Sequence, residues 1–162
     1  MGDISVKIEP RELRILRQET GQFGRRFPIG PVCWPHFDLL WIHEGEVTLK
    51  IGTESETVRL TAPNGHLIFP NVPFSGRSVN GKANASICHF QGGPFEGERT
   101  TKLFAKPDPR DTLHVQNLLR LSLSYAEREA EHLVRARLLG AILDCFVEGR
   151  IPKEHPNRIT QA

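Results

Sequence analysis

The chain has 162 residues and a formal net charge of +2 at pH 7, from 21 Lys and Arg residues against 19 Asp and Glu residues. A chain of this length suits one domain with a core of its own, and its nearly balanced charge gives no general reason to expect binding to nucleic acid or to a membrane surface. No stretch approaches the ~18 apolar residues of a membrane-spanning helix, and the three widely spaced cysteines, Cys33, Cys88 and Cys145, predict free thiols in a reducing compartment and therefore a cytoplasmic location.

The first hundred or so residues are predicted to form short antiparallel strands. Gly and Pro are frequent in this part, and turn signals such as "GTES", "APNG" and "VNGK" separate the short apolar runs. Short strands that recur every 8–12 residues or so indicate an antiparallel sandwich or barrel. The predicted strands are residues 4–8, 13–18, 39–43, 47–51, 57–60, 67–69 and 86–91.

From "KPDPRD" onward the pattern becomes helical. A first helix is predicted over "TLHVQNLLRLSLSY", in which Leu113, Leu118 and Leu121 recur at helical spacing. A second helix is predicted over residues 126–147, and it carries apolar residues on two sides, both of which must be buried. One side can cover the strands or the first helix, so the other side indicates a partner chain. The predicted dimer interface on this second helix comprises Leu133, Ala136, Gly140, Leu143 and Val147.

Two motifs carry a resemblance to a known family. The stretches "FDLLWIHEGEVTLKIG" and "APNGHLIFPNVPF" resemble the two motifs of a cupin, a small antiparallel jelly-roll barrel. The order of barrel, short helix, long helix and "PNRI" is similar to the N-terminal effector-binding and dimerisation half of AraC/XylS-type transcription regulators. The resemblance implies a mainly β fold: a cupin-like antiparallel jelly-roll barrel followed by two C-terminal α-helices.

The same resemblance implies a division of the chain. Residues 1–106 would form the effector-binding barrel with an N-terminal arm, residues 107–149 a helical dimerisation hairpin, and residues 150–162 a linker toward a DNA-binding domain that is absent here. The arm, up to about residue 20, would either add an edge strand or fold over the mouth of the pocket when an effector binds.

Most of the metal ligands of the cupin family are replaced in this sequence. The two His positions of the first motif fall near Val32 and Trp34, and Asp38 stands where the family usually has Glu. The His that follows "VP" in the second motif is Phe74. A metal centre needs imidazole and carboxylate groups that converge on one point, and no nucleophile motif or phosphate-binding loop appears either. The sequence therefore predicts no metal, no other cofactor and no enzymatic activity.

Two alternatives remain open at this point. His36, Asp38 and His89 occupy candidate inward positions, so a metal-dependent cupin enzyme with atypical ligands, an isomerase or a dioxygenase, is the first. A standalone binding module without a DNA-binding partner is the second. The other histidines, His66 among them, are predicted to lie in solvent at turns or on polar helix faces.

The alternation of side chains along a strand predicts which residues point into the barrel. If Asp38 points inward, Leu40 does too, whereas Trp41 points outward. The family resemblance gives Arg26, or equally its neighbour Arg25, the place of an arginine that can hydrogen-bond the effector. A mostly apolar cavity with a few polar groups fits a small-molecule site, and it also fits a filled core. The predicted ligand-binding residues are Arg26, Trp34, His36, Asp38, Leu40, Phe74, Ile87 and His89.

These observations favour one function among the alternatives. The sequence predicts the ligand-sensing and dimerisation domain of an AraC-type regulator, which forms a homodimer through its second helix. Such a protein would contact DNA only through the missing C-terminal domain and would not contact a membrane. The identity of the effector does not follow from the residues, because a sugar, an aromatic acid and an amine all fit such a cavity.

Overall fold

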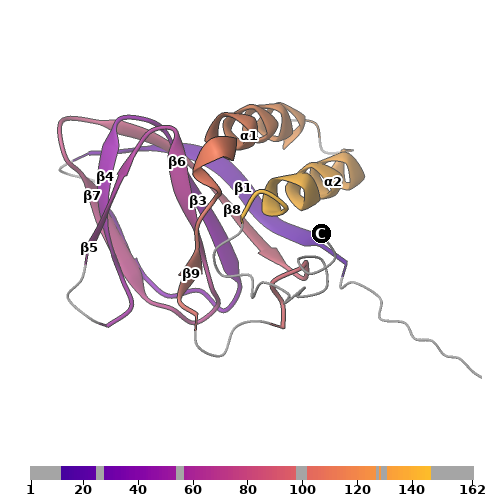
Figure 1. Cartoon of the computed structure of the whole chain (residues 1–162), viewed down its shortest axis with the longest axis horizontal. Coiled ribbons are helices and arrows are strands. Elements are labelled where there is room, and N and C mark those ends of the chain that lie inside the picture. Colours follow the sequence, from indigo (N-terminus) through magenta and orange to yellow (C-terminus); the bar gives the residue numbers. More distant parts are fainter. Residues whose placement is uncertain are drawn as a thin grey trace, which may run out of the picture.

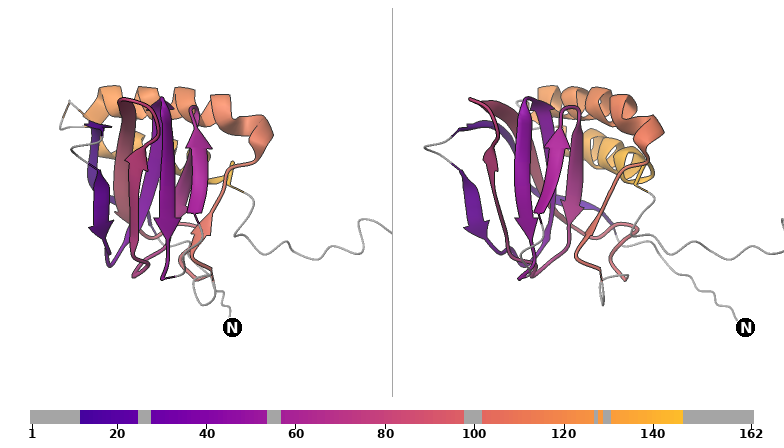
Figure 2. Two further views of the ribbon diagram at one scale, coloured as in Figure 1. Left: turned by 90° about the vertical axis from the view of Figure 1, so that its left-hand side faces the viewer. Right: turned by 60° about the vertical axis from the view of Figure 1, so that its left-hand side comes forward.

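The computed structural model describes residues 12–24, 28–53, 57–97, 102–126, 128 and 131–146. Two antiparallel β-sheets face each other, and two helices cover the outer face of the larger sheet (Figure 1). Figure 2 shows the helices on the side of the molecule that lies away from the smaller sheet. The predicted strand over residues 4–8 lies outside the described residues.

The order of the strands defines the fold. The larger sheet contains, in spatial order, β1 (Arg14–Phe23), β8 (Ala83–Gln91), β3 (Phe37–Glu44), β6 (Asn64–Ile68) and β9 (Phe104–Ala105). The smaller sheet contains β2 (Ile29–Val32), β7 (Phe74–Ser78), β4 (Glu46–Ile51) and β5 (Thr57–Thr61). The first eight strands therefore pair as β1 with β8, β2 with β7, β3 with β6 and β4 with β5, which is the arrangement of a jelly roll. The predicted cupin-like fold is confirmed, although the two sheets do not close into a continuous barrel.

Strands β3 and β4 show why these residues form a hairpin. All residues of β3 from Phe37 to Ile42 are buried, because one face packs toward the smaller sheet and the other toward the helices. In β4, buried Val47, Leu49 and Ile51 alternate with more exposed residues. Gly45 forms the turn between the two strands with φ of +93°, a conformation that L side chains rarely adopt.

Three strands were not predicted from the sequence: β2, β7 and β9. The β2 sequence "IGPV" contains Pro31, which is tolerated because β2 lies at the edge of the smaller sheet. The β7 sequence "FSGRS" contains Gly76, where a Cβ atom would lie 2.5 Å from Leu49 Cδ2 and 2.9 Å from the Thr48 carbonyl oxygen. Strand β9 has two residues. None of the three has enough alternating apolar residues to be recognised as a strand.

The helical part begins at a short 3-10 turn, Pro109–Asp111, in which the Asp108 carboxylate accepts a hydrogen bond from the backbone N–H of Arg110. Helix α1 spans Thr112–Ala126, close to its prediction, and helix α2 spans His132–Leu143. The second helix is thus shorter than predicted at both ends. After it the chain turns back toward Pro107, which forms an isolated bridge with Phe146. No helix in the described part of the chain is long and apolar enough to cross a membrane.

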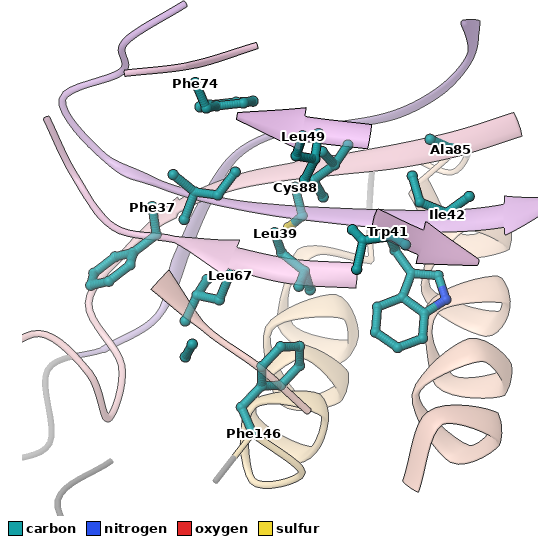
Figure 3. Packing of buried hydrophobic residues seen from close by; sticks show 14 of the residues in the cluster. Phe37, Leu39, Trp41, Ile42, Leu49, Leu67, Phe74, Ala85, Cys88 and Phe146 are labelled. Atoms are coloured by element: carbon teal, nitrogen blue, oxygen red, sulfur yellow. The ribbon is translucent and has the colours of Figure 1, made fainter. Parts of the chain in front are cut away.

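The core has two layers, one between the sheets and one between the larger sheet and the helices (Figure 3). Trp41 is 0% exposed and anchors the second layer, since its Nε1 donates a hydrogen bond to Gln116 Oε1 at 2.8 Å and its ring meets Phe146 edge to face at 6.5 Å. Cys88 lies in the same layer, and burial raises the pKa of its thiol to about 12, so it stays a thiol.

One histidine prediction is wrong. His66 was expected in solvent, but it is buried on β6 and its ring stacks on Phe104 at 4.5 Å. The reason is tertiary, because Phe104 belongs to β9, which pairs with β6 from a distant part of the chain. All three cysteines are free thiols, as predicted.

Candidate functional site

A cavity of about 270 Å³ lies between the two sheets. Strands β1, β3 and β8 form one wall, and β2 and β7 form the other. Most of its lining is apolar, including Ile29, Val32, Leu40, Phe74 and Ile87. The polar side chains are concentrated on the wall formed by the larger sheet.

Strand register places the polar side chains on this wall. Arg17 of β1 lies opposite His89 of β8, and His89 lies opposite Asp38 of β3. Directly opposed residues of neighbouring strands share one face of a sheet. The three side chains therefore form one row across the sheet, and a second row of Glu19, Ile87 and Leu40 lies beside it.

Asp38 and His89 form the buried centre of the site. Each residue is 3% exposed, and His89 Nε2 lies 3.2 Å from Asp38 Oδ2 without the alignment of a hydrogen bond. Asp38 Oδ1, His89 Nε2 and His36 Nε2 have no hydrogen-bond partner among the described residues. Buried polar atoms in folded proteins nearly always have a partner, so this concentration of unpartnered atoms in one place marks the site.

Two aromatic rings, those of Trp34 and His36, pack against the His89 ring. The Trp34 ring stacks on His36 at 5.8 Å and lies 4.9 Å from the His89 ring, and the two His rings are 4.7 Å apart. Burial lowers the pKa of His36, and neighbouring His89 lowers it further, whereas Asp38 raises it. His36 is thus favoured as a neutral imidazole.

Arg17 and Glu19 at the cavity wall neutralise each other. The Arg17 guanidinium donates a hydrogen bond to the Glu19 carboxylate, and this bond holds the pKa of Glu19 below its ordinary value and raises that of Arg17. Both side chains are about half exposed, so the pair is screened by solvent. Arg17 is therefore engaged with a carboxylate other than Asp38.

The structure brings together most of the predicted ligand-binding residues. Trp34, Asp38, Leu40, Phe74, Ile87 and His89 line the cavity. His36 stacks beside it, and Arg26 lies outside the described residues.

The sequence-based prediction missed the contribution of β1, namely Arg17, Glu19 and Phe23. The strand was predicted to end at Gln18, and its polar sequence "RQETGQ" has no apolar alternation. In addition, a register shift between Ile15 and Arg17 changes which residues point inward, and such a bulge leaves little trace in a sequence.

The described residues do not fit the metal centre of a cupin. They include no group of three or more His, Cys, Asp or Glu side chains that could hold an ion. His36 and His89 pack ring against ring at 4.7 Å, whereas metal-binding imidazoles direct their nitrogens at one common point. The position after "VP" is occupied by Phe74, which lines the cavity.

A groove beside α2 is a second candidate site. A groove of about 850 Å³ runs between α2 and the start of β1, and Leu133, Ala136 and Gly140 line it. Leu133 is 60% exposed. In contrast, Leu143 is 0% exposed and packs in the core of its own chain, and Val147 lies outside the described residues.

Comparisons with known proteins give structural neighbours only. No protein-family model and no curated protein match the sequence. Similar solved structures include an RmlC-like cupin family protein with a double-stranded β-helix fold from Methanocaldococcus jannaschii, with 14% identity, a TM-score of 0.41, and coverage of 54% of this chain and 85% of the other. The apo K231A variant of ToxT from Vibrio cholerae has 14% identity and a TM-score of 0.41, with coverage of 68% of this chain and 46% of that chain.

A third neighbour corrects a prediction. YcfD, a ribosomal oxygenase from Escherichia coli, has 15% identity and a TM-score of 0.42, with coverage of 72% of this chain and 29% of YcfD. The prediction that the chain is not an enzyme is therefore contradicted: similar solved structures include an oxygenase, so enzymatic activity is not excluded. At these identities and TM-scores, the neighbours assign neither a family nor a function to this chain.

Proposed function

We propose that this domain binds a small organic ligand between its two sheets, and that it serves as the sensing and dimerisation part of a transcription regulator. The observation that carries the proposal is the pair of unpartnered buried atoms, Asp38 Oδ1 and His89 Nε2, on a cavity whose other walls are apolar. A few convergent polar groups in an apolar concavity are typical of small-molecule sites. A filled core would instead satisfy these groups locally.

Strand β1 links the cavity to the helices. Its Arg17 and Glu19 line the cavity, whereas Gln18 between them faces the helices. The Gln18 side chain donates to Ser122 Oγ of α1 at 3.0 Å and accepts from Arg135 Nη1 of α2 at 3.0 Å. A ligand that favours one position of β1 would thereby favour one position of both helices, which is a population shift of the kind that regulators use.

The partner in this proposal is a second copy of the chain, which docks on α2 through Leu133, Ala136 and Gly140. Ala136 is small enough to allow close approach of a second helix, and the exposed Leu133 supplies apolar area, whereas Gly140 faces Leu13 of its own chain across the groove. DNA contact would come from a helix-turn-helix domain outside these 162 residues. A reading frame that continues past residue 162 into two helix-turn-helix patterns would support this part of the proposal.

We expect an Ile87→Trp substitution to weaken ligand binding strongly, because the larger side chain takes up space in a cavity of about 270 Å³. A thermal-shift screen of metabolites on the wild-type chain identifies ligands, and titration of each hit against the variant should show affinity at least about tenfold weaker. Leu16→Trp is the matched control, because Leu16 is 41% exposed and does not line the cavity. Hits that bind Ile87→Trp as tightly as the wild type would place the ligand elsewhere and contradict the proposal.

We expect a Leu133→Asp substitution to weaken self-association, since it places a charge in the proposed helix interface. Sedimentation equilibrium should show a dimer of the wild-type chain and a dissociation constant at least about tenfold higher for the variant. Leu113→Asp on α1 is the control, because Leu113 is equally exposed at 64%. Only monomer in the wild-type chain at high concentration would remove the dimer. Leu143→Asp does not serve this purpose, because Leu143 lies in the core and the charge would unfold the domain.

A further inference from the structure

The buried end of the cavity contains a carboxylate whose charge no described side chain fully compensates. Asp38 has a side chain that is 4% exposed, and its Oδ1 has no hydrogen-bond partner among the described residues. Its Oδ2 lies near His89 Nε2, in a contact that is an ion pair only when the imidazole is protonated. Burial of a carboxylate is costly unless a cation or several donors compensate it. The arrangement therefore favours a guest that brings a donor, and a charged donor above all.

The charges of the described lining disfavour an anionic ligand. Among the lining residues that the structure describes, Arg17 is the one Arg or Lys side chain, and it donates to Glu19. Apart from His89, the described lining holds two carboxyl groups, those of Asp38 and Glu19, against the one guanidinium of Arg17. An organic acid would place another anion beside Asp38, and like charges at close range repel. A cation would instead be attracted by the carboxyl group of Asp38, which Arg17 does not pair with.

The rest of the cavity lining indicates the size and polarity of the remainder of the ligand. Leu40, Phe74 and Ile87 supply apolar contacts on both sheets. The volume of about 270 Å³ lies below the ~300 Å³ at the lower end of the range for ligand pockets, so the molecule is compact. Trp34 lies on the same cavity next to His89, at 4.9 Å between ring centroids. An indole face near a carboxylate is a suitable environment for an ammonium group, because its π-electrons attract a cation.

We propose that the ligand of this cavity is a small primary amine with an apolar body, an inference that rests on the proposed ligand-binding function. Its ammonium group donates to Asp38 Oδ1 beside the Trp34 ring, and its body packs against Leu40, Phe74 and Ile87. An ammonium group has three donors and no acceptor, so one N–H can serve the unpartnered Asp38 Oδ1 while the others remain for further acceptors.

Three probes of nearly equal size test the charge preference on the unmodified chain: benzylamine, benzyl alcohol and benzoate. Isothermal titration at neutral pH, where the amine is protonated, should show benzylamine binding at least about tenfold more tightly than benzyl alcohol, and no detectable binding of benzoate. Asp38→Asn preserves the shape of the side chain and removes its charge. We expect it to weaken benzylamine binding at least about tenfold, toward the affinity of the alcohol.

The outcomes separate the two proposals. Benzyl alcohol or benzoate could bind as tightly as benzylamine, compete with it for the same cavity and lose binding in Ile87→Trp. This result would contradict the amine as the ligand class and leave the proposed ligand-binding function intact. If no probe binds even at millimolar concentration, the proposal of an amine ligand is contradicted as well. The proposed function is contradicted too if the metabolite screen yields no ligand whose affinity is weaker for Ile87→Trp than for the wild type. The comparison of the three probes does not require a variant, so a failure of Asp38→Asn to fold would not prevent it.

Discussion

A Gly65→Ala substitution is expected to destabilise the domain by about 3 kcal/mol or more, which is a large part of the stability of an ordinary domain. Gly65 on β6 lies opposite Trp41 on β3. A Cβ atom at Gly65 would lie 2.3 Å from the Leu40 carbonyl oxygen, 2.6 Å from Trp41 Cε3 and 2.8 Å from Trp41 Cα. Two of these three atoms belong to the backbone of a central strand, so they cannot move aside without disturbing the sheet.

Gly21→Ala is the matched control for this experiment. Gly21 also lies within a strand, but a Cβ atom there would meet no atom within 4 Å, and its φ is not positive. We expect its stability to be unchanged or to rise by roughly 0.5–1 kcal/mol, because Ala loses less backbone freedom than Gly on folding. Urea unfolding followed by circular dichroism measures both variants. Equal midpoints for Gly65→Ala and Gly21→Ala would contradict the close approach of β6 to β3.

The Trp41→Ala substitution is expected to lower the free energy of unfolding by about 3–5 kcal/mol. The indole is 0% exposed and fills the layer between the larger sheet and the helices, where it contacts Phe146 and donates to Gln116. The variant would therefore lose apolar burial, leave a cavity and remove the donor for Gln116 Oε1.

A smaller change separates these contributions. Trp41→Phe keeps an aromatic ring and removes the N–H donor. We expect its free energy of unfolding to fall by about 1–3 kcal/mol, because the Gln116 oxygen loses its partner and the side chain is smaller. Leu113→Ala on the exposed side of α1 is the control, and its free energy of unfolding should change by less than about 0.5 kcal/mol beyond helix propensity. Urea unfolding of the three variants gives the comparison. A loss below about 1 kcal/mol for Trp41→Ala would show that the helices do not depend on this contact.

Several elements were predictable from local sequence. The alternation of Val47, Leu49 and Ile51 predicted β4, and the spacing of the leucines predicted α1 nearly to its ends. A short apolar run predicts the middle of β3, over residues 39–43. Strand alternation places Asp38 and Leu40 on one face, and both line the cavity. These features follow from local patterns, because periodicities of 2 and about 3.6 residues determine which face of a strand or helix a side chain occupies.

The candidate site was only partly predictable. Trp34, Asp38 and His89 come from three separate segments. Strand alternation and the family resemblance together predict that all three belong to one ligand site. The sequence does not show that Asp38 and His89 would be adjacent, since this depends on the register between β3 and β8. Nor does it show that Arg17 is engaged with Glu19, because the bulge in β1 decides which residues of that strand turn inward.

By itself, the sequence determined the class of fold: strands with alternating apolar residues, followed by two helices. Only the tertiary structure decided which strands pair, that β2, β7 and β9 are strands, and that Leu143 packs in the core of its own chain. It also decided that two polar side chains meet in a buried cavity. The physical reason is that periodicity is a local property of the chain, whereas register, burial and the pairing of charges depend on residues that are distant in sequence and meet only when both sheets and both helices have assembled.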